Sequence, residues 1–118
     1  MVFTVERTIE SSKVTHAGYE EALRIVQDPV AMIRLNSLVI DVRAGSDADV
    51  YIIKDNLSIC GFRMIQEYTA KAEKLPDGIL FHVKAGPVTS VNRWKVSRVP
   101  DSDGEIEIKE EARVKVRV

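Results

Sequence analysis

The chain has 118 residues, which is enough for one hydrophobic core and predicts a single domain over residues 1–118. With 45% hydrophobic and 30% charged residues, it has the composition of a folded globular protein and not of a disordered segment. The formal net charge of -1 argues against nucleic acid as a partner, because phosphate binding requires clustered Lys and Arg side chains.

The cysteine count and the absence of long apolar runs indicate the cellular compartment of the protein. A single cysteine, Cys60, excludes an internal disulfide and a cysteine-rich zinc site, which suits a reducing cytoplasm. The first residues show no signal-peptide pattern, and no apolar run approaches the about 20 residues that a membrane span requires. We therefore expect a soluble cytoplasmic protein without a membrane span.

The chain opens with an alternating pattern. Residues 2–10 place Val5 and Ile9 on one side and polar residues on the other, which predicts a half-buried strand. Arg7 is the one charged residue on the apolar side of this strand. A charge at such a position needs a partner, so Arg7 is a candidate functional residue.

Two helices are predicted next. Apolar residues recur at helical spacing and predict a helix over about residues 15–27, with Thr15 as its N-cap. Asp28 followed by Pro29 predicts a second, short helix over about 29–35, because Asp caps helices and Pro is favoured at the first helical position.

Six consecutive strands fill the remainder of the chain, each ended by turn residues. The predicted strands cover residues 38–43, 50–54, 57–74, 79–86, 88–99 and 106–118.

Three turns or irregularities separate the middle strands. Asp55 and Asn56 predict a turn, and Gly61 predicts a bulge that bends the long strand after it starts. Residues 75–78 predict a hairpin turn in which Pro presets φ and Gly78 supplies a positive φ.

The last strand has the clearest pattern. From Ile106 to Val118 apolar residues alternate with charged ones, and only Glu110 breaks the apolar side.

The order strand, two helices, six strands predicts an α+β fold. Hairpin-linked strands pair with their neighbours, so we expect a seven-stranded antiparallel sheet that curls around the two short N-terminal helices. This order, with the helices joined at Asp28–Pro29, resembles the START-like or Bet v 1-like (SRPBCC, helix-grip) superfamily over the whole chain. Members of that superfamily usually end in a long helix that closes a cavity over the concave face.

The sequence departs from the superfamily at its C-terminal end, and this departure has an implication for assembly. The sequence reaches Val118 still in strand pattern, so we expect the long C-terminal helix to be absent. An uncovered apolar face of this size favours a covering surface, and we expect a homodimer.

The resemblance also implies a site. In the sheet of the superfamily the first and last strands are neighbours, so Arg7 and Glu110 are expected to form a cross-strand pair inside the concavity. A structural ion pair is the preferred interpretation, because buried charges are normally paired. The alternative is that Arg7 anchors a ligand carboxylate or carbonyl with its planar fork of donors.

Large side chains on the predicted inner face are candidates to line a pocket, although core packing is the preferred interpretation for any single one of them. The predicted ligand-binding set is Arg7, Phe62, Met64, Tyr68, Phe81, Trp94 and Glu110.

Other chemistry-bearing residues give no site. Cys60 is interpreted as a small core residue, and His82 as a solvated side chain on the outer face of its strand. His16 is placed in the first turn of the first helix. We predict no catalytic residue, metal ion or cofactor, since no phosphate-binding glycine loop and no ligand cluster is present.

Three functions follow from this layout. The preferred one is binding or transport of an apolar or amphipathic small molecule, lipid-like or polyketide-like, between sheet and helices. The second is an enzyme similar to polyketide cyclases or hydrolases that uses Glu110 as a general base and Arg7 to polarise a carbonyl. The third is a protein-interaction module or homodimer that docks through its open concave face.

Overall fold

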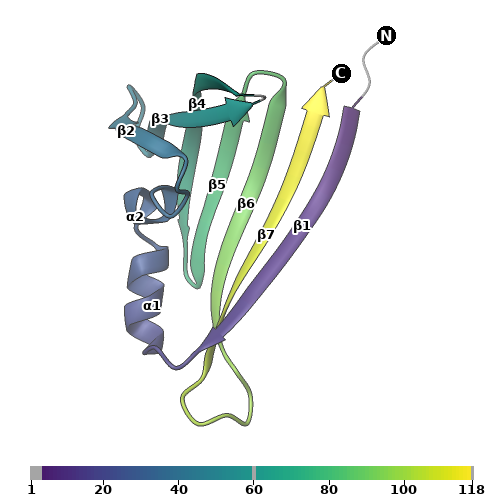
Figure 1. Ribbon diagram of the computed structural model, residues 1–118. Coiled ribbons are helices and arrows are strands. Elements are labelled where there is room, and N and C mark those ends of the chain that lie inside the picture. The colour runs from purple at the N-terminus through teal and green to yellow at the C-terminus, as the bar shows by residue number, and fades with distance from the viewer. Residues whose placement is uncertain (1–3, 60, 118) are drawn as a thin grey trace.

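In the computed structural model, which describes residues 4–59 and 61–117, one strongly curved sheet holds two short helices on its concave side (Figure 1). The sheet is antiparallel and has the strand order β1-β7-β6-β5-β4-β3-β2. The elements are β1 (Thr4–Thr15), α1 (Tyr19–Val26), α2 (Pro29–Ile33), β2 (Val39–Ala44), β3 (Val50–Ile59), β4 (Phe62–Leu75), β5 (Gly78–Ala85), β6 (Val88–Arg98) and β7 (Ile106–Arg117). The predicted fold class, a seven-stranded curved sheet with two short N-terminal helices, is confirmed.

The first and last strands are neighbours along their whole length. β1 pairs with β7 from Thr4 opposite Arg117 to Thr15 opposite Ile106. This pairing corrects the predicted start of the first helix: Thr15 ends a strand, and Gly18 is the N-cap of α1. Cross-strand pairing with β7 offers the backbone of residues 11–15 more hydrogen bonds than an isolated extra helical turn would. His16 consequently lies in the connection before α1 and not in its first turn.

The short α2 forms where Asp28 and Pro29 predict it. The Asp28 side chain accepts a hydrogen bond from the backbone N–H of Ala31 at 3.2 Å, and Pro29 occupies the first helical position. The cap satisfies one of the free N–H groups at the start of the helix. The helix ends at Ile33, two residues earlier than predicted.

The predicted turn at Asp55–Asn56 is wrong. β3 continues through both residues, because Asp55 pairs with Val39 of β2 on one side and Gln66 of β4 on the other. The chain turns instead at Gly61, whose φ of 81° lies in the left-handed region that favours glycine, so the predicted bulge at this residue is also wrong. Cys60, predicted to be a core residue, lies outside the described residues.

The hairpin predicted at residues 75–78 is present, but its glycine is needed for a different reason. Gly78 already belongs to β5 and is not among the described glycines with positive φ. A Cβ atom added to Gly78 would lie 1.7 Å from the carbonyl oxygen of Trp94. Close approach of the β6 backbone, and not turn conformation, therefore requires glycine at this position.

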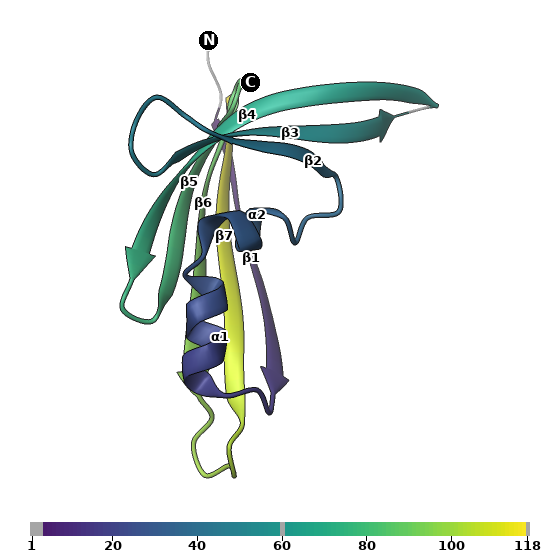
Figure 2. The same ribbon diagram turned by 90° about the vertical axis from the view of Figure 1, so that its left-hand side faces the viewer.

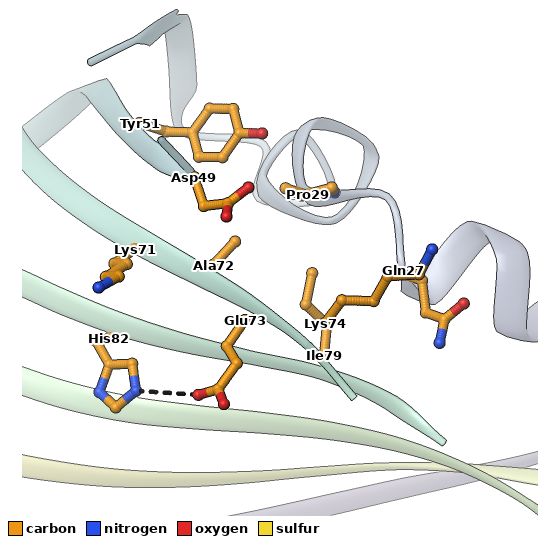
Figure 3. A pocket seen from close by; sticks show the side chains of 10 residues that line it. All are labelled: Gln27, Pro29, Asp49, Tyr51, Lys71, Ala72, Glu73, Lys74, Ile79 and His82. Carbon is orange, nitrogen blue, oxygen red and sulfur yellow. Dashed lines mark ion pairs between the residues drawn. The ribbon is translucent and has the colours of Figure 1, made fainter. Parts of the chain in front are cut away.

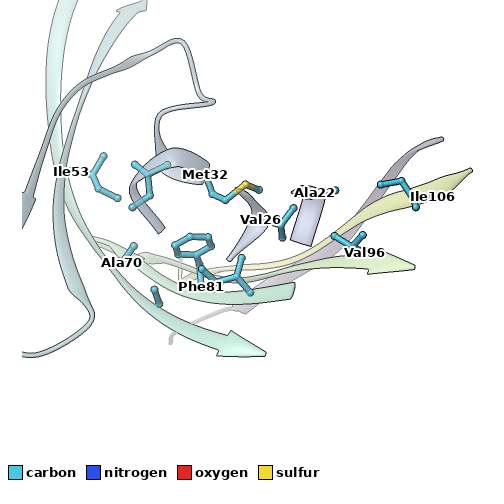
Figure 4. Packing of buried hydrophobic residues seen from close by; sticks show 11 residues of the cluster. Ala22, Val26, Met32, Ile53, Ala70, Phe81, Val96 and Ile106 are labelled. Carbon is cyan, nitrogen blue, oxygen red and sulfur yellow. The ribbon is translucent and has the colours of Figure 1, made fainter. Parts of the chain in front are cut away.

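The hydrophobic core lies between the two helices and the concave face of the sheet (Figure 4). Ala22 and Val26 of α1 and Met32 of α2 pack onto side chains from five strands. The buried hydrophobic residues among those described are Ala22, Val26, Met32, Ile33, Ile53, Ala70, Ala72, Ile79, Phe81, Val96 and Ile106. The predicted inward parity of Ala70, Phe81 and Ile106 is thus confirmed.

Two parts of the concave face are not covered. The side chains of Val5 and Ile9 on β1 are 52% and 57% exposed. β4 runs past the end of its partner β5, which pairs only from Thr69 onward, and this overhang (residues 62–68) projects sideways with β3 (Figure 2). Among residues 4–59 and 61–117, no helix crosses either region, and none is long and apolar enough to traverse a membrane.

Candidate functional site

A cavity of about 330 Å³ opens on the concave face beneath α2. Its floor comes from strands β3 to β7 and its roof from the end of α2 and the residues that follow it. Most of the wall is apolar because these strand positions all share the inward parity. The lining residues are Met32, Ile33, Leu35, Asn36, Ile53, Tyr68, Ala70, Phe81, Val83, Asn92, Trp94 and Glu110.

A tyrosine–aspartate pair forms one polar edge of the cavity. The Tyr68 hydroxyl donates a hydrogen bond to Oδ1 of Asp55 at 3.1 Å, and Asp55 is only 7% exposed. Burial raises the pKa of Asp55 above its ordinary value of 3.8, and the hydrogen bond from Tyr68 partly offsets this rise. Burial, and then the Asp55 charge, raise the pKa of Tyr68 well above its usual range, so the phenol stays protonated.

The opposite edge carries an amide and a carboxylate. Glu110 of β7 lies directly across from Trp94 of β6, and Asn92 lies two residues further along the same strand. Oδ1 of Asn92 accepts a hydrogen bond from the Ser90 hydroxyl at 2.8 Å, which leaves the amide nitrogen free to donate. Glu110 is half-buried and forms no ion pair with any described residue.

The structure brings together four of the seven side chains predicted to bind a ligand: Tyr68, Phe81, Trp94 and Glu110 line the cavity. Phe62 and Met64 do not, because both belong to the β4 overhang and are 74% and 52% exposed.

Arg7 also lies outside the cavity, and the expected cross-strand pair with Glu110 is wrong. Arg7 lies opposite Val114, whereas Glu110 lies opposite Ser11. The two positions are four residues apart along the strands, which corresponds to about 13 Å. The resemblance to the superfamily predicted that the first and last strands are neighbours but not their register.

Sequence inspection missed Asp55 and Asn92. Asp55 was assigned to a turn because Asp and Asn are common turn residues. Its spacing of two residues from Ile53 was the available signal, since that spacing places both side chains on one face of a continuous strand. Asn92 has the same parity as Trp94 and was detectable by the same rule.

A second, larger cavity of about 600 Å³ lies beside the β4–β5 hairpin (Figure 3). About half of its wall is polar, and this half is charged: Lys71, Glu73 and His82 are exposed, and Nε2 of His82 lies 3.8 Å from Oε2 of Glu73. The exposed, outward position predicted for His82 is confirmed. Solvated charges of this kind hold an apolar molecule poorly, so the smaller concave cavity is the better candidate.

No family model and no curated protein matches the sequence. Solved structures do match. DR_A0006 from Deinococcus radiodurans is 10% identical with a TM-score of 0.67, and the match covers 90% of this chain and 81% of that one. A conserved protein from Geobacillus kaustophilus is 14% identical with a TM-score of 0.69, and the match covers 93% and 74%. Norcoclaurine synthase from Thalictrum flavum is 16% identical with a TM-score of 0.62, and the match covers 96% and 71%.

A further match is the di-domain ARO/CYC BexL from the BE-7585A biosynthetic pathway, at 13% identity and a TM-score of 0.61; it covers 96% of this chain and 37% of that one. At these identities the likeness concerns the fold alone. The resemblance to Bet v 1-like structures that the order of elements predicted is confirmed at that level.

Proposed function

We propose that this chain, which has the helix-grip fold of Bet v 1-like proteins, binds an apolar or amphipathic small molecule in the cavity beneath α2. The observation that carries the proposal is the concave cavity itself. Its volume of about 330 Å³ lies at the lower end of the range of about 300–1,000 Å³ typical of small-molecule sites. A mainly apolar wall with a few convergent polar groups is the usual composition of such sites.

The two polar edges suit an amphipathic ligand. Apolar atoms of the ligand would be buried against Phe81, Ile53 and Met32, which supplies affinity through the hydrophobic effect. Tyr68 on one side and Glu110 on the other would fix the orientation of a polar group. Contacts of this kind are sufficient for a binding protein.

A solved structure of the same fold supports the binding of a small molecule. Norcoclaurine synthase, which matches this chain at a TM-score of 0.62, has been solved in complex with dopamine and hydroxybenzaldehyde. That protein therefore accommodates small aromatic molecules with polar substituents. The identity at 16% carries none of its residues over to this chain.

The proposal can be tested by filling the cavity. Trp94 is the only tryptophan and lines the cavity, so its fluorescence reports on occupancy. Val83→Phe places a larger side chain in the cavity, whereas Lys84→Phe, one residue away on β5, faces the opposite side and serves as the control. We expect a hydrophobic probe such as octanol to shift the fluorescence of the unaltered protein and of Lys84→Phe.

With Val83→Phe we expect binding to weaken by about tenfold, since a phenyl ring takes up volume that the probe needs. Native mass spectrometry of the purified protein would show whether a small molecule co-purifies with it. Equal binding by Val83→Phe and Lys84→Phe would contradict the proposal.

Self-association is a second candidate, and the uncovered part of the concave face favours it. Val5 and Ile9 are more than half exposed and lie on the inner face of β1, opposite Val116 and Ala112 of β7. The same native mass spectra would show a dimer. Ile9→Lys should abolish it and Thr8→Lys, on the outer face, should not.

A further inference from the structure

The sign of the charge in the concave cavity identifies a class of ligand. Among the described lining residues, Glu110 is the only side chain that carries a full charge at neutral pH. The lining contains no lysine, arginine or histidine. Arg7, which the sequence suggested as an anchor for a carboxylate, lies about four residues away along β1 and does not reach the lining.

Among residues 4–59 and 61–117, no cation forms an ion pair with Glu110. Its direct neighbours across the strands are Ser11 and Trp94. Lys13 is the nearest described cation by register, since it pairs with Ile108 and is therefore diagonal to Glu110 on the concave face. The Lys13 side chain is exposed and no ion pair of 4.0 Å or less joins it to Glu110. A half-buried carboxylate that forms no ion pair can accept a charge-assisted hydrogen bond from a positively charged ligand group.

Tyr68 strengthens the preference for a donor. The hydroxyl hydrogen of Tyr68 is directed to Asp55. Tyr68 can therefore act toward a ligand only as a hydrogen-bond acceptor, through the lone pairs of its oxygen. The carboxylate of Asp55 behind it adds negative potential on that side of the cavity. An ammonium group would satisfy such acceptors, whereas a carboxylate would be repelled by them.

Trp94 supplies a further contact for a cation. It faces Glu110 across β6 and β7, so a group bound to the carboxylate lies next to the indole. Indole is the aromatic side chain that attracts cations most strongly, and the interaction grows as the pair is desolvated.

We propose that the ligand of the concave cavity is an amphipathic amine, whose protonated nitrogen pairs with Glu110 beside Trp94 while its apolar part lies against Phe81 and Ile53. This inference rests on the proposed function, since it names the class of molecule that the same cavity binds. The selectivity comes from one carboxylate and is therefore separable from the apolar burial that supplies the affinity.

Three probes of equal chain length separate the two proposals: octylamine, octanol and octanoate, titrated into the protein at pH 7 and followed by Trp94 fluorescence and calorimetry. We expect octylamine to bind about tenfold tighter than octanol, with octanoate weakest, because a charge-assisted hydrogen bond is stronger than a neutral one and a second carboxylate is repelled. Glu110→Gln should reduce the ratio of octylamine affinity to octanol affinity from about ten to about one. Glu111→Gln, on the outer face of the same strand, is the matched control and should behave like the unaltered protein.

The possible outcomes have distinct meanings. Octanoate binding as tightly as octylamine, or an unchanged preference in Glu110→Gln, would overturn the amine inference while cavity binding stands. If none of the three probes binds, the proposed function fails and the inference fails with it. The ranking on the unaltered protein is a test by itself, so it does not depend on whether Glu110→Gln folds.

Discussion

Two stretches of the same concave face, one under the helices and one beyond them, have the same sequence pattern and opposite surroundings. Ile106 lies beneath α1 and is 2% exposed, whereas Ile9, about six residue pairs away along the same β1–β7 ladder, is 57% exposed. Alternation of apolar and polar residues therefore reports which face a side chain takes. It does not report whether another element covers that face.

The largest expected effect comes from truncating one residue in each stretch. Ile106→Ala should lower the free energy of unfolding by about 2–4 kcal/mol, because it removes buried methyl groups and leaves a cavity. Ile9→Ala should cost less than about 1 kcal/mol, since its side chain is already in contact with solvent. Urea denaturation of the two variants measures the difference. Equal losses would mean that the region around Ile9 is covered in solution.

A smaller effect is expected at the edge of the covered region, where Tyr68 meets Asp55. Tyr68→Phe should destabilise the protein by about 1–2 kcal/mol at pH 7, because it leaves a buried carboxylate without its hydrogen bond. The phenyl ring introduced by this substitution packs as the ring of Tyr68 does, so the loss of stability measures the hydrogen bond and not a change in side-chain volume.

The same pair makes stability depend on pH. The pKa of Asp55 in the folded protein is raised above 3.8, so the folded state holds this proton more tightly than the unfolded state does. Protonated Asp55 therefore contributes fully to the stability of the folded protein below pH 3.8. This contribution is lost as the pH rises through the pKa that Asp55 has in the folded protein. Asp55→Asn should remove this dependence. Because the Tyr68 hydrogen bond lowers the pKa of Asp55, Tyr68→Phe should extend the dependence to higher pH.

Denaturation curves collected between pH 4 and pH 7 would show both changes. A dependence in Asp55→Asn identical to that of the unaltered protein would assign the effect to another group.

The smallest expected effect concerns α2, the helix that covers the concave cavity. Asp28→Ala removes the side chain that caps α2, and we expect a loss of about 0.5–1 kcal/mol. Asp28→Asn is the matched control, since Asn caps helices nearly as well as Asp. Because α2 roofs the concave cavity, the Trp94 indole should become more accessible to a soluble quencher in Asp28→Ala, and its fluorescence should be quenched more strongly than in the unaltered protein. Unchanged quenching would show that the roof does not depend on this cap.

The fold followed from local signals, because strand alternation and the Asp28–Pro29 cap act within a few residues. The errors arose where a long-range pairing overrode a local preference: Asp55 became part of β3 because strands on both sides pair with it. Thr15 similarly joined β1 because β7 offered a partner.

Half of the candidate site was predictable for the same reason. Parity along single strands placed Tyr68, Phe81 and Trp94 correctly on the inner face. The separation of Arg7 from Glu110 depends on the register between the two strands most distant in sequence, which no local pattern encodes. The overhang of β4 was accessible, because the predicted strand 57–74 is much longer than its hairpin partner 79–86; Phe62 and Met64 were misassigned because inward parity alone was used to place them.

The ladder between β1 and β7 also constrains the order in which the protein folds. Among the described strands of this sheet, β1 leaves the ribosome before the others, and its hydrogen-bonding partner β7 leaves after them. Its edge must stay unpaired while roughly a hundred residues are synthesised, a delay of about 5–20 seconds at ordinary translation rates. The polar residues that dominate β1, among them Thr8, Glu10 and Ser12, keep the waiting strand soluble until the chain is closed.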